Sequence, residues 1–292
     1  MKAFTLKNIV LLTSCLIFTN GCSVKMYQNK GLITPQSNST KLDFSTNKTV
    51  IILPVMLDGS IKNFAFDTGA ELTVVQKEVT TGIKIKATGA DGKKVKIGTG
   101  TVDLFKISDV EFKNIYSFNA NMDYLTKKIP NFGGIIGQSI ICKANWLIDY
   151  SKNKIEFTDK TIETMGFETL STKNIRNPHI DMMIEDEVYS VLIDLGSSVA
   201  MTIPENSKLA EKLLAKYTFK DIIREVYRLS GAEIVTEKVA IIPKVKIGNS
   251  SFEKVEVNIL PSKSLKIGNA FFKDYTIYID NTNGVYKIKK MR

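Results

Sequence analysis

The chain carries one local pattern twice, and this internal repeat restricts the possible folds more than any other feature. An apolar stretch ends in Asp67-Thr68-Gly69, and a second ends in Asp194-Leu195-Gly196, 127 positions later (194 − 67). Before each aspartate, two apolar stretches flank a polar turn, at Asp58 in the first copy and at Glu185 in the second, which is typical of a β-hairpin. Repeats of this kind indicate one structural unit used twice. We therefore expect two related units, each with a carboxylate at the end of a hairpin.

The similarity continues after the aspartates, with slightly wider spacing. Gly137 and Gly268 follow matching apolar residues and lie 131 positions apart (268 − 137). Further matched segments are 106–115 with 246–255, 134–141 with 265–272, and 145–157 with 275–288. Short or alternating apolar runs, divided by Gly and Asn turns, predict strands in both halves. We expect a mostly β protein.

One segment departs from this pattern. Residues 202–217 have helical periodicity, and Thr202 with Glu205 matches a capping box. The sequence therefore predicts one added helix in the second unit. The predicted organisation is a signal peptide (1–21), a polar tether (22–47), a first lobe (48–160), a connection (161–177) and a second lobe (178–292).

The N-terminal residues have the layout of an export signal, with two lysines before an apolar stretch from Ile9 to Phe18. That stretch is shorter than the roughly 20 residues of a membrane-spanning helix. Gly21-Cys22 resembles the end of a bacterial lipobox, although Thr19 stands where that motif usually has Leu. The resemblance implies a cell-envelope lipoprotein with a lipid anchor at Cys22. An ordinary cleaved signal and an uncleaved anchor are the alternatives.

Composition excludes several classes of function. The net charge is +10, but the lysines are spread along the chain, which favours a solvated surface over a binding patch for anionic polymers or membranes. No nucleic-acid-binding motif is present, so we expect no nucleic-acid partner. His179 is the only histidine and there are three cysteines, which excludes histidine-cluster metal sites and a disulfide framework. We expect His179 at the start of a strand, with no cofactor and no metal.

The duplicated aspartates, the Asp-Thr-Gly-Ala of residues 67–70 and the later Ile135-Ile136-Gly137 together resemble the aspartic peptidases. The similarity is to bacterial retropepsin-like proteins with two fused lobes, and it covers residues 48–292. It implies two β-barrel lobes that meet at a central cleft, a polypeptide substrate and a monomeric enzyme. The catalytic residues would be Asp67 and Asp194, supported by Thr68, Gly69, Ala70, Gly196, Ser197, Gly137 and Gly268.

This resemblance implies a reaction that needs neither histidine nor metal. Two carboxylates held close together share one proton, because both cannot ionise easily. One would take a proton from a water molecule while the other polarises the scissile carbonyl. The hairpin tips at residues 88–94 and at Ser230-Gly231 would cover the cleft. Asp149 and Asp280 also match each other, but each precedes a polar turn, so we interpret them as turn residues.

Two positions differ from the family pattern. Leu195 replaces the hydroxyl residue of the second motif, and Lys266 replaces an apolar residue before Ile267-Gly268. Ser197 stands where many family members have a hydroxyl that bonds the carboxylate, so we expect it to provide polar support. Two hypotheses follow: an envelope-tethered aspartic endopeptidase, or a two-lobed binding protein whose catalysis Leu195 has disabled.

Overall fold

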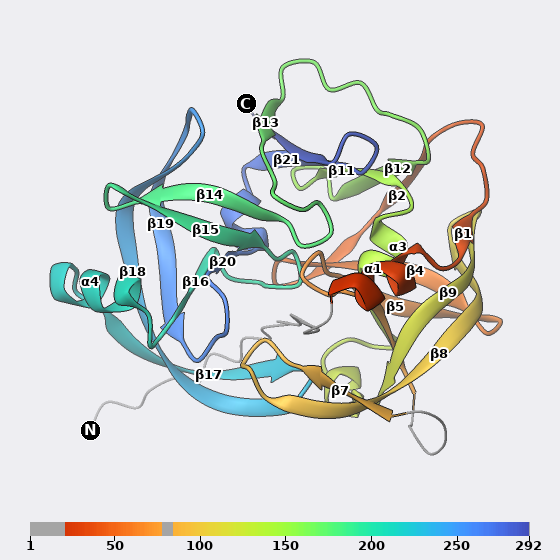
Figure 1. Ribbon diagram of the computed structural model, residues 1–292, viewed down its shortest axis with the longest axis horizontal. Coiled ribbons are helices and arrows are strands. Elements are labelled where there is room, and N and C mark those ends of the chain that lie inside the picture. The colour runs from red at the N-terminus through yellow and green to blue at the C-terminus, as the bar shows by residue number, and fades with distance from the viewer. Residues whose placement is uncertain (1–20, 78–83, 292) are drawn as a thin grey trace.

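A computed structural model describes residues 21–77 and 84–291, and it confirms a mostly β protein built from three sheets (Figure 1). Helical elements in the described part are short. They are α1 (Gly21–Asn29), α2 (Asp123–Thr126), α3 (Gln138–Ile141), α4 (Lys208–Lys216) and the 3₁₀ helix η1 (Asn269–Phe272).

The first sheet is built mainly from the half of the chain that contains Asp67. Its strand order is β1-β9-β6-β10-β5-β4-β8-β7, with β3 paired to β4 and β8 paired also to β9. The strands are β1 (Leu32–Ile33), β3 (Ser45–Asn47), β4 (Val50–Leu57), β5 (Ser60–Phe66), β6 (Thr73–Gln76), β7 (Lys84–Thr88), β8 (Lys94–Ile107), β9 (Val110–Ala120) and β10 (Phe132–Ile136).

The second sheet contains the strand that leads to Asp194. Its order is β14-β15-β20-β16-β19-β18-β17, and the additional pairing of β14 with β18 closes six of these strands into a barrel. The strands are β14 (His179–Ile184), β15 (Glu187–Ile193), β16 (Met201–Pro204), β17 (Lys220–Arg228), β18 (Gly231–Ile247), β19 (Ser250–Leu260) and β20 (Lys266–Ile267). His179 opens β14, as the sequence predicted.

The two sheets repeat the same succession of pairings. In the first sheet, neighbouring strands pair in the order β4, β5, β10, β6, β9, β8. The second sheet has the equivalent order β14, β15, β20, β16, β19, β18. The directions also agree: β10 is parallel to β5 and antiparallel to β6, and β20 is parallel to β15 and antiparallel to β16. The repeat read from the sequence is therefore a repeat of topology.

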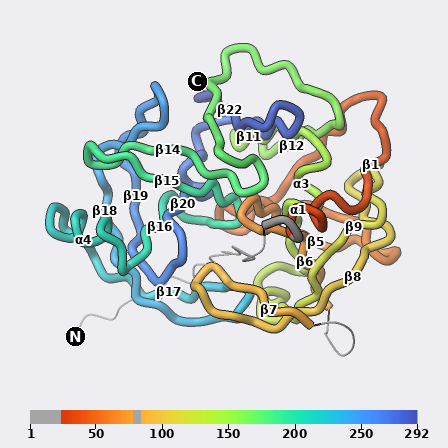
Figure 2. The backbone as a smooth tube through the Cα atoms, viewed as in Figure 1, coloured from red at the N-terminus to blue at the C-terminus, as the bar shows by residue number. Residues whose placement is uncertain are grey.

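A six-stranded sheet joins the two halves, in the order β13-β22-β21-β11-β12-β2. Its central pair, β11 with β21, brings together the segments that the sequence matched at 145–157 and 275–288. Figure 2 shows this sheet at the top, between the other two. The strands are β2 (Thr40–Asp43), β11 (Asn145–Asp149), β12 (Lys154–Thr158), β13 (Glu168–Leu170), β21 (Tyr275–Asp280) and β22 (Val285–Lys290).

The hairpins that precede the two aspartates turn in the same way. Asp58 and Gly59 have φ angles of 50° and 73°, and Glu185 and Asp186 have 51° and 65°. Positive φ at both central residues is typical of the tight turns that match the right-handed twist of a hairpin. Both predicted hairpins are thus present, as β4–β5 and β14–β15.

The predicted tether is wrong from residue 24 onward. Val24 is buried in α1, and the segment that follows forms β1 against β9, β2 against β12 and β3 against β4. Polar composition misled the prediction, because these are short edge strands whose exposed side chains need not alternate strongly. Residues 1–20 of the predicted signal peptide lie outside the described residues.

Two further boundaries need correction. Helix α4 begins at Lys208 rather than after Thr202, because residues 201–204 pair with β19 as strand β16. The N-cap is Ser207, whose side chain accepts a hydrogen bond from the backbone N–H of Ala210 at 3.1 Å. The predicted connection at 161–177 contains β13, which pairs with β22.

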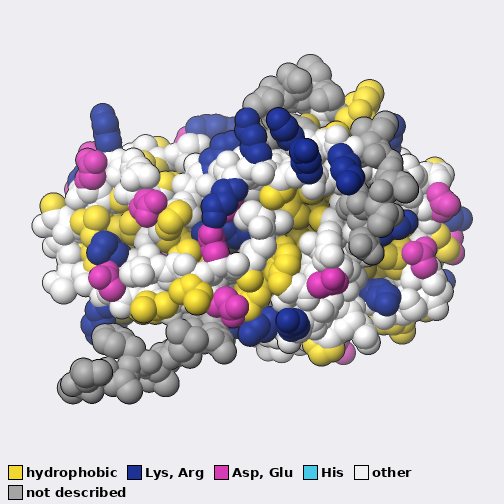
Figure 3. All heavy atoms as spheres, turned by 90° about the horizontal axis from the view of Figure 1, so that it is seen from below, with side chains coloured by type: hydrophobic (Ala, Val, Ile, Leu, Met, Phe, Trp, Pro, Cys, Tyr) yellow, Lys and Arg dark blue, Asp and Glu magenta, His cyan; other side chains and the backbone are white. Residues whose placement is uncertain are grey.

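The large hydrophobic core runs through both halves and the joining sheet. Trp146, Phe66 and Phe157 pack in it as an aromatic cluster, with Trp146 stacked on Phe157 at 4.6 Å between ring centroids. On the face seen from below, several basic side chains gather in the upper middle of the view, and others lie among acidic and apolar side chains (Figure 3).

Candidate active site

The two aspartates occupy equivalent positions at the ends of equivalent strands. Asp67 follows β5, and its backbone N–H donates to Ile136 O at 3.0 Å; Asp194 follows β15, and its N–H donates to Ile267 O at 2.9 Å. Both side chains are fully buried. Each loop is therefore fixed by the strand that passes behind it, β10 in the first half and β20 in the second.

The structure brings the two carboxyl groups together. A Cβ built on Gly69 would lie 2.9 Å from Asp194 Oδ1 and 3.2 Å from Asp67 Oδ1. Both carboxyl oxygens therefore lie beside the same point next to Gly69, and the distance between them is at most the sum of these two values. A Cβ on Gly196 would lie 2.3 Å from Asp67 Cγ. Neither position could hold a side chain without moving a carboxylate, which is why both loops need glycine there.

Backbone N–H groups of each loop bind the carboxylate of that loop. Asp67 Oδ1 accepts from Gly69 at 2.8 Å and from Ala70 at 3.1 Å, and Asp194 Oδ1 accepts from Gly196 at 3.0 Å. Hydrogen bonds of this kind fix the orientation of a buried carboxylate.

Thr68 joins the two loops, whereas Leu195 does not return the contact. Thr68 Oγ1 donates to Ile193 O at 2.7 Å and accepts from the N–H of Leu195 at 2.9 Å. Leu195 packs in the large core cluster instead. The sequence shows that position 195 lacks a hydroxyl side chain.

Gly137 and Gly268 allow the backing segments to approach the loops closely. A Cβ on Gly137 would lie 2.4 Å from Leu72 O, and one on Gly268 would lie 2.5 Å from Ser197 O. Contacts this short with backbone atoms exclude any side chain.

Two amide side chains support the loops, and the sequence reasoning missed them. Gln138 Nε2 donates to Thr68 O at 2.8 Å, and Asn269 Nδ2 donates to Leu195 O at 2.5 Å and to Ser197 O at 2.9 Å. They lie 131 positions apart (269 − 138), directly after the two matched glycines. That shared spacing, with an amide residue in both copies, was the signal that could have identified them.

Ser197 does not play its predicted part. Its hydroxyl is buried and, within the described residues, has no hydrogen-bond partner. The outer oxygen of the second carboxylate is bound instead by Lys266, whose Nζ lies 2.8 Å from Asp194 Oδ2. Both side chains of this ion pair are buried. The sequence shows that Lys266 replaces an apolar residue of the family pattern, but it does not show which residue the lysine contacts.

The two hairpin tips, at residues 88–94 and at Ser230-Gly231, meet each other. Ser230 Oγ donates to Asp91 Oδ2 at 2.9 Å, and Lys93 forms an ion pair with Glu233. Figure 1 shows the β7–β8 hairpin extending to β17 at the bottom of the view. Ala90 packs against Leu192, two residues before Asp194. The first tip therefore covers the strand that carries the second aspartate.

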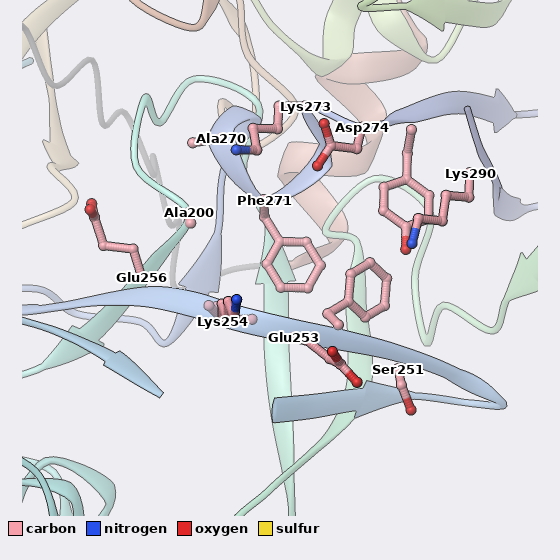
Figure 4. A pocket seen from close by; sticks show the side chains of 13 residues that line it. Ala200, Ser251, Glu253, Lys254, Glu256, Ala270, Phe271, Lys273, Asp274 and Lys290 are labelled. Atoms are coloured by element: carbon pink, nitrogen blue, oxygen red, sulfur yellow. The ribbon is translucent and has the colours of Figure 1, made fainter. Parts of the chain in front are cut away.

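A surface hollow lies away from the acid pair. It has a volume of about 510 Å³ and is formed by β19 together with the segment 270–275 (Figure 4). Figure 4 shows Phe271 within it, with Lys254, Asp274 and Lys290 around its edge. Neither Asp67 nor Asp194 lines this hollow, and it mixes acidic with basic side chains. We do not assign it to the acid pair.

Comparison with known proteins assigns no family: no protein-family model matches the chain, and no curated protein matches it. None of the helices in residues 21–77 and 84–291 is both long and apolar enough to cross a membrane. Across the same described ranges, no three His, Cys, Asp or Glu side chains are grouped to hold a metal ion.

Proposed function

We propose that this protein is an aspartic endopeptidase in which Asp67 and Asp194 share one proton and activate a water molecule. The observation that supports it is the meeting of two fully buried carboxylates, each delivered by an equivalent loop and each in contact with the glycine of the other loop. Two such carboxylates in a site of low dielectric constant do not both ionise easily, so the pair holds one proton in common.

The reaction then follows from the positions of the groups. The ionised carboxylate accepts a proton from water as the water oxygen attacks the scissile carbonyl carbon. The protonated carboxyl donates to the carbonyl oxygen. In the second step the C–N bond breaks: the carboxyl that took the water proton gives it to the leaving amine, and the other carboxylate takes back the proton of the former carbonyl oxygen as the C=O bond forms again. Thr68, Gln138 and Asn269 hold the loops in register during both steps.

Substrate entry requires the hairpin tips to separate. Both carboxylates are fully buried in the described structure, and Ala90 covers the approach beside Leu192. We propose that an extended polypeptide enters between the hairpins of residues 84–107 and 220–247. Closure over the substrate would then exclude bulk water from the acid pair.

The test is proteolysis by single variants. Wild-type protein and the variants Asp67→Asn and Asp194→Asn are incubated with casein, with and without a metal chelator. Each single change is expected to abolish cleavage, because it removes one of the two carboxyl groups that hold the proton in common. The chelator is expected to have no effect. Asp149→Asn is the matched control, since that carboxylate bonds Ser151 and Lys152 in its own turn. Undiminished cleavage by either active-site variant would contradict the assignment.

A binding protein with the same fold is the second candidate, and Leu195 with Lys266 supports it. The second loop has Leu195 where the first has the hydroxyl of Thr68, and the carboxylate of Asp194 contacts Lys266. Both features make the acid pair asymmetric. This candidate predicts that peptides are retained without turnover, and that a pepstatin-like mimic of the transition state does not compete with them. Cleavage by purified wild-type protein excludes it.

We also propose that the chain is exported and anchored by a lipid on Cys22. Val24, two residues later, is already buried against the folded body. The anchor would therefore hold the protein close to the membrane surface rather than at the end of a long tether. Mass spectrometry of the mature N-terminus tests this: a diacylated or triacylated Cys22 supports it, and an unmodified N-terminus further along the chain contradicts it.

A further inference from the structure

Lys266 differs in charge from its counterpart in the other half of the chain. Strand β20 pairs Lys266 with Leu192, and strand β10 pairs Ile135 with Ala65 at the equivalent register. Lys266 and Ile135 lie 131 positions apart (266 − 135), the spacing of the other matched residues in this region. The second half thus places an ammonium group where the first half has the apolar side chain of isoleucine.

The ammonium group lies in a site that gives it little access to water. Lys266 is 2% exposed, and the hollow that it lines is too narrow to hold a water molecule. Burying an ammonium group is strongly unfavourable unless a carboxylate compensates its charge. Asp194 Oδ2, at 2.8 Å, supplies that compensation. The pair is therefore a fixed part of the site and not a surface contact.

Other charged groups face this site from neighbouring elements. Arg228, at the end of β17, lines the same hollow as Lys266, and it donates to Pro261 O at 3.0 Å. Arg228 pairs in turn with Glu233 and is attracted by Asp91 at the tip of the other hairpin. The positive charge of Arg228 is thus compensated by the hairpin tips, whereas that of Lys266 is compensated by the acid pair.

We propose that Lys266 is a positioning residue that fixes the negative charge of the acid pair on Asp194 and leaves the shared proton on Asp67. This rests on the proposed function. The ammonium stabilises the ionised form of the carboxylate that it touches, so the charge does not divide equally between the two halves. Asp194 then accepts the proton of the attacking water, and Asp67 donates to the substrate carbonyl. A carboxylate has about four acceptor sites, so Asp194 can bind water in addition to Lys266.

The position of Lys266 has a consequence for pH dependence. A fixed positive charge lets the pair release protons at lower pH, so the active form with one shared proton occurs at lower pH than in a symmetric pair. Removing the ammonium should move both limbs of the pH profile of kcat/KM upward by about one pH unit or more. A residue that only packed against the loop would change the height of the profile and leave both limbs in place.

The experiment compares three lysine variants of the full chain. Lys266→Met removes the charge at similar length, Lys266→Arg keeps it, and Lys208→Met changes an exposed lysine of α4 as the control. The profile of kcat/KM is expected to shift upward in Lys266→Met alone. A folded Lys266→Met protein with the wild-type limbs would overturn the proposal.

A second measurement does not depend on activity. Carboxyl ¹³C resonances of Asp67 and Asp194, assigned with the Asp67→Asn and Asp194→Asn proteins, are followed against pH in the unliganded wild type. The proton is expected on Asp67 when the pair carries one, and a proton on Asp194 overturns the inference even if Lys266→Met does not fold. Should the wild type cleave no peptide, the same titration still tests Lys266, while the proposed function alone fails.

Discussion

Thr68 binds the backbone on both sides of the second aspartate. Its hydroxyl donates to Ile193 O at 2.7 Å and accepts from the N–H of Leu195 at 2.9 Å, so that Asp194 lies between its two partners. A side chain from one half of the chain therefore fixes the loop of the other half. Since the side chain of Leu195 has no polar group, Thr68 is the one residue directly before the two loop glycines whose side chain can connect the loops.

Replacing Thr68 by valine should destabilise the protein by about 1–3 kcal/mol. The change keeps the shape of the side chain but leaves the buried Ile193 O and the Leu195 N–H without this partner. The measurement is the free energy of unfolding in urea. Thr68→Ser, which keeps the hydroxyl, is the control and should lose less than half as much. Equal stability of the valine variant and the wild type would show that the hydroxyl does not join the loops.

Leu195 should behave as a core residue. It is fully buried in the large core cluster, and its truncation to alanine is expected to cost about 2–5 kcal/mol of unfolding free energy. Leu214→Ala, on the exposed side of α4, is the matched control and should cost about 0.5 kcal/mol or less. Similar losses in the two variants would mean that the second loop can be repacked without Leu195.

Much of the fold was predictable because its signals are local. The hairpins around Asp58 and Glu185 follow from alternating apolar residues and a polar turn, and the repeat itself showed that both turns belong to equivalent units. The positions of Asp67 and Asp194 at the strand ends followed from the same pattern. Only the meeting of the two loops required the resemblance to a known family.

What could not be predicted depends on partners far apart in the sequence. Lys266 and Asp194 are separated by 72 residues, and no local pattern shows that the lysine points toward the acid and not toward solvent. Likewise, β2 at residues 40–43 pairs with β12, more than a hundred residues later, through backbone groups that every residue carries. Polar edge strands of this kind resemble a linker in sequence.

The contact between the hairpin tips should control how often they separate. Ser230→Ala removes the hydrogen bond to Asp91, and we expect amide hydrogens of residues 89–93 and 230–233 to exchange about 5–10 times faster, which corresponds to one hydrogen bond. Global stability should change little. Ser60→Ala is the control, because the Ser60 hydroxyl bonds Leu57 O within its own turn. Faster exchange confined to residues 230–233 would indicate that the tips move independently.

Tyr286 should make stability fall at alkaline pH. Burial raises the pKa of its hydroxyl above the ordinary value of 10.0, because the ionised form would lose its hydration. Below pH 10 the folded and unfolded chains both keep this proton. Above pH 10 the unfolded chain releases it and the folded chain does not, so the free energy of unfolding decreases by up to about 1.4 kcal/mol per pH unit.

The variant Tyr286→Phe isolates this effect, since other tyrosines with raised pKa values, such as Tyr124 and Tyr278, titrate in both proteins. Urea unfolding of wild type and variant at pH 8, 9 and 11 gives the difference between them at each pH. That difference should be constant from pH 8 to 9, and should then move in favour of the variant at pH 11. A constant difference over the whole range would mean that water reaches the Tyr286 hydroxyl in the folded protein.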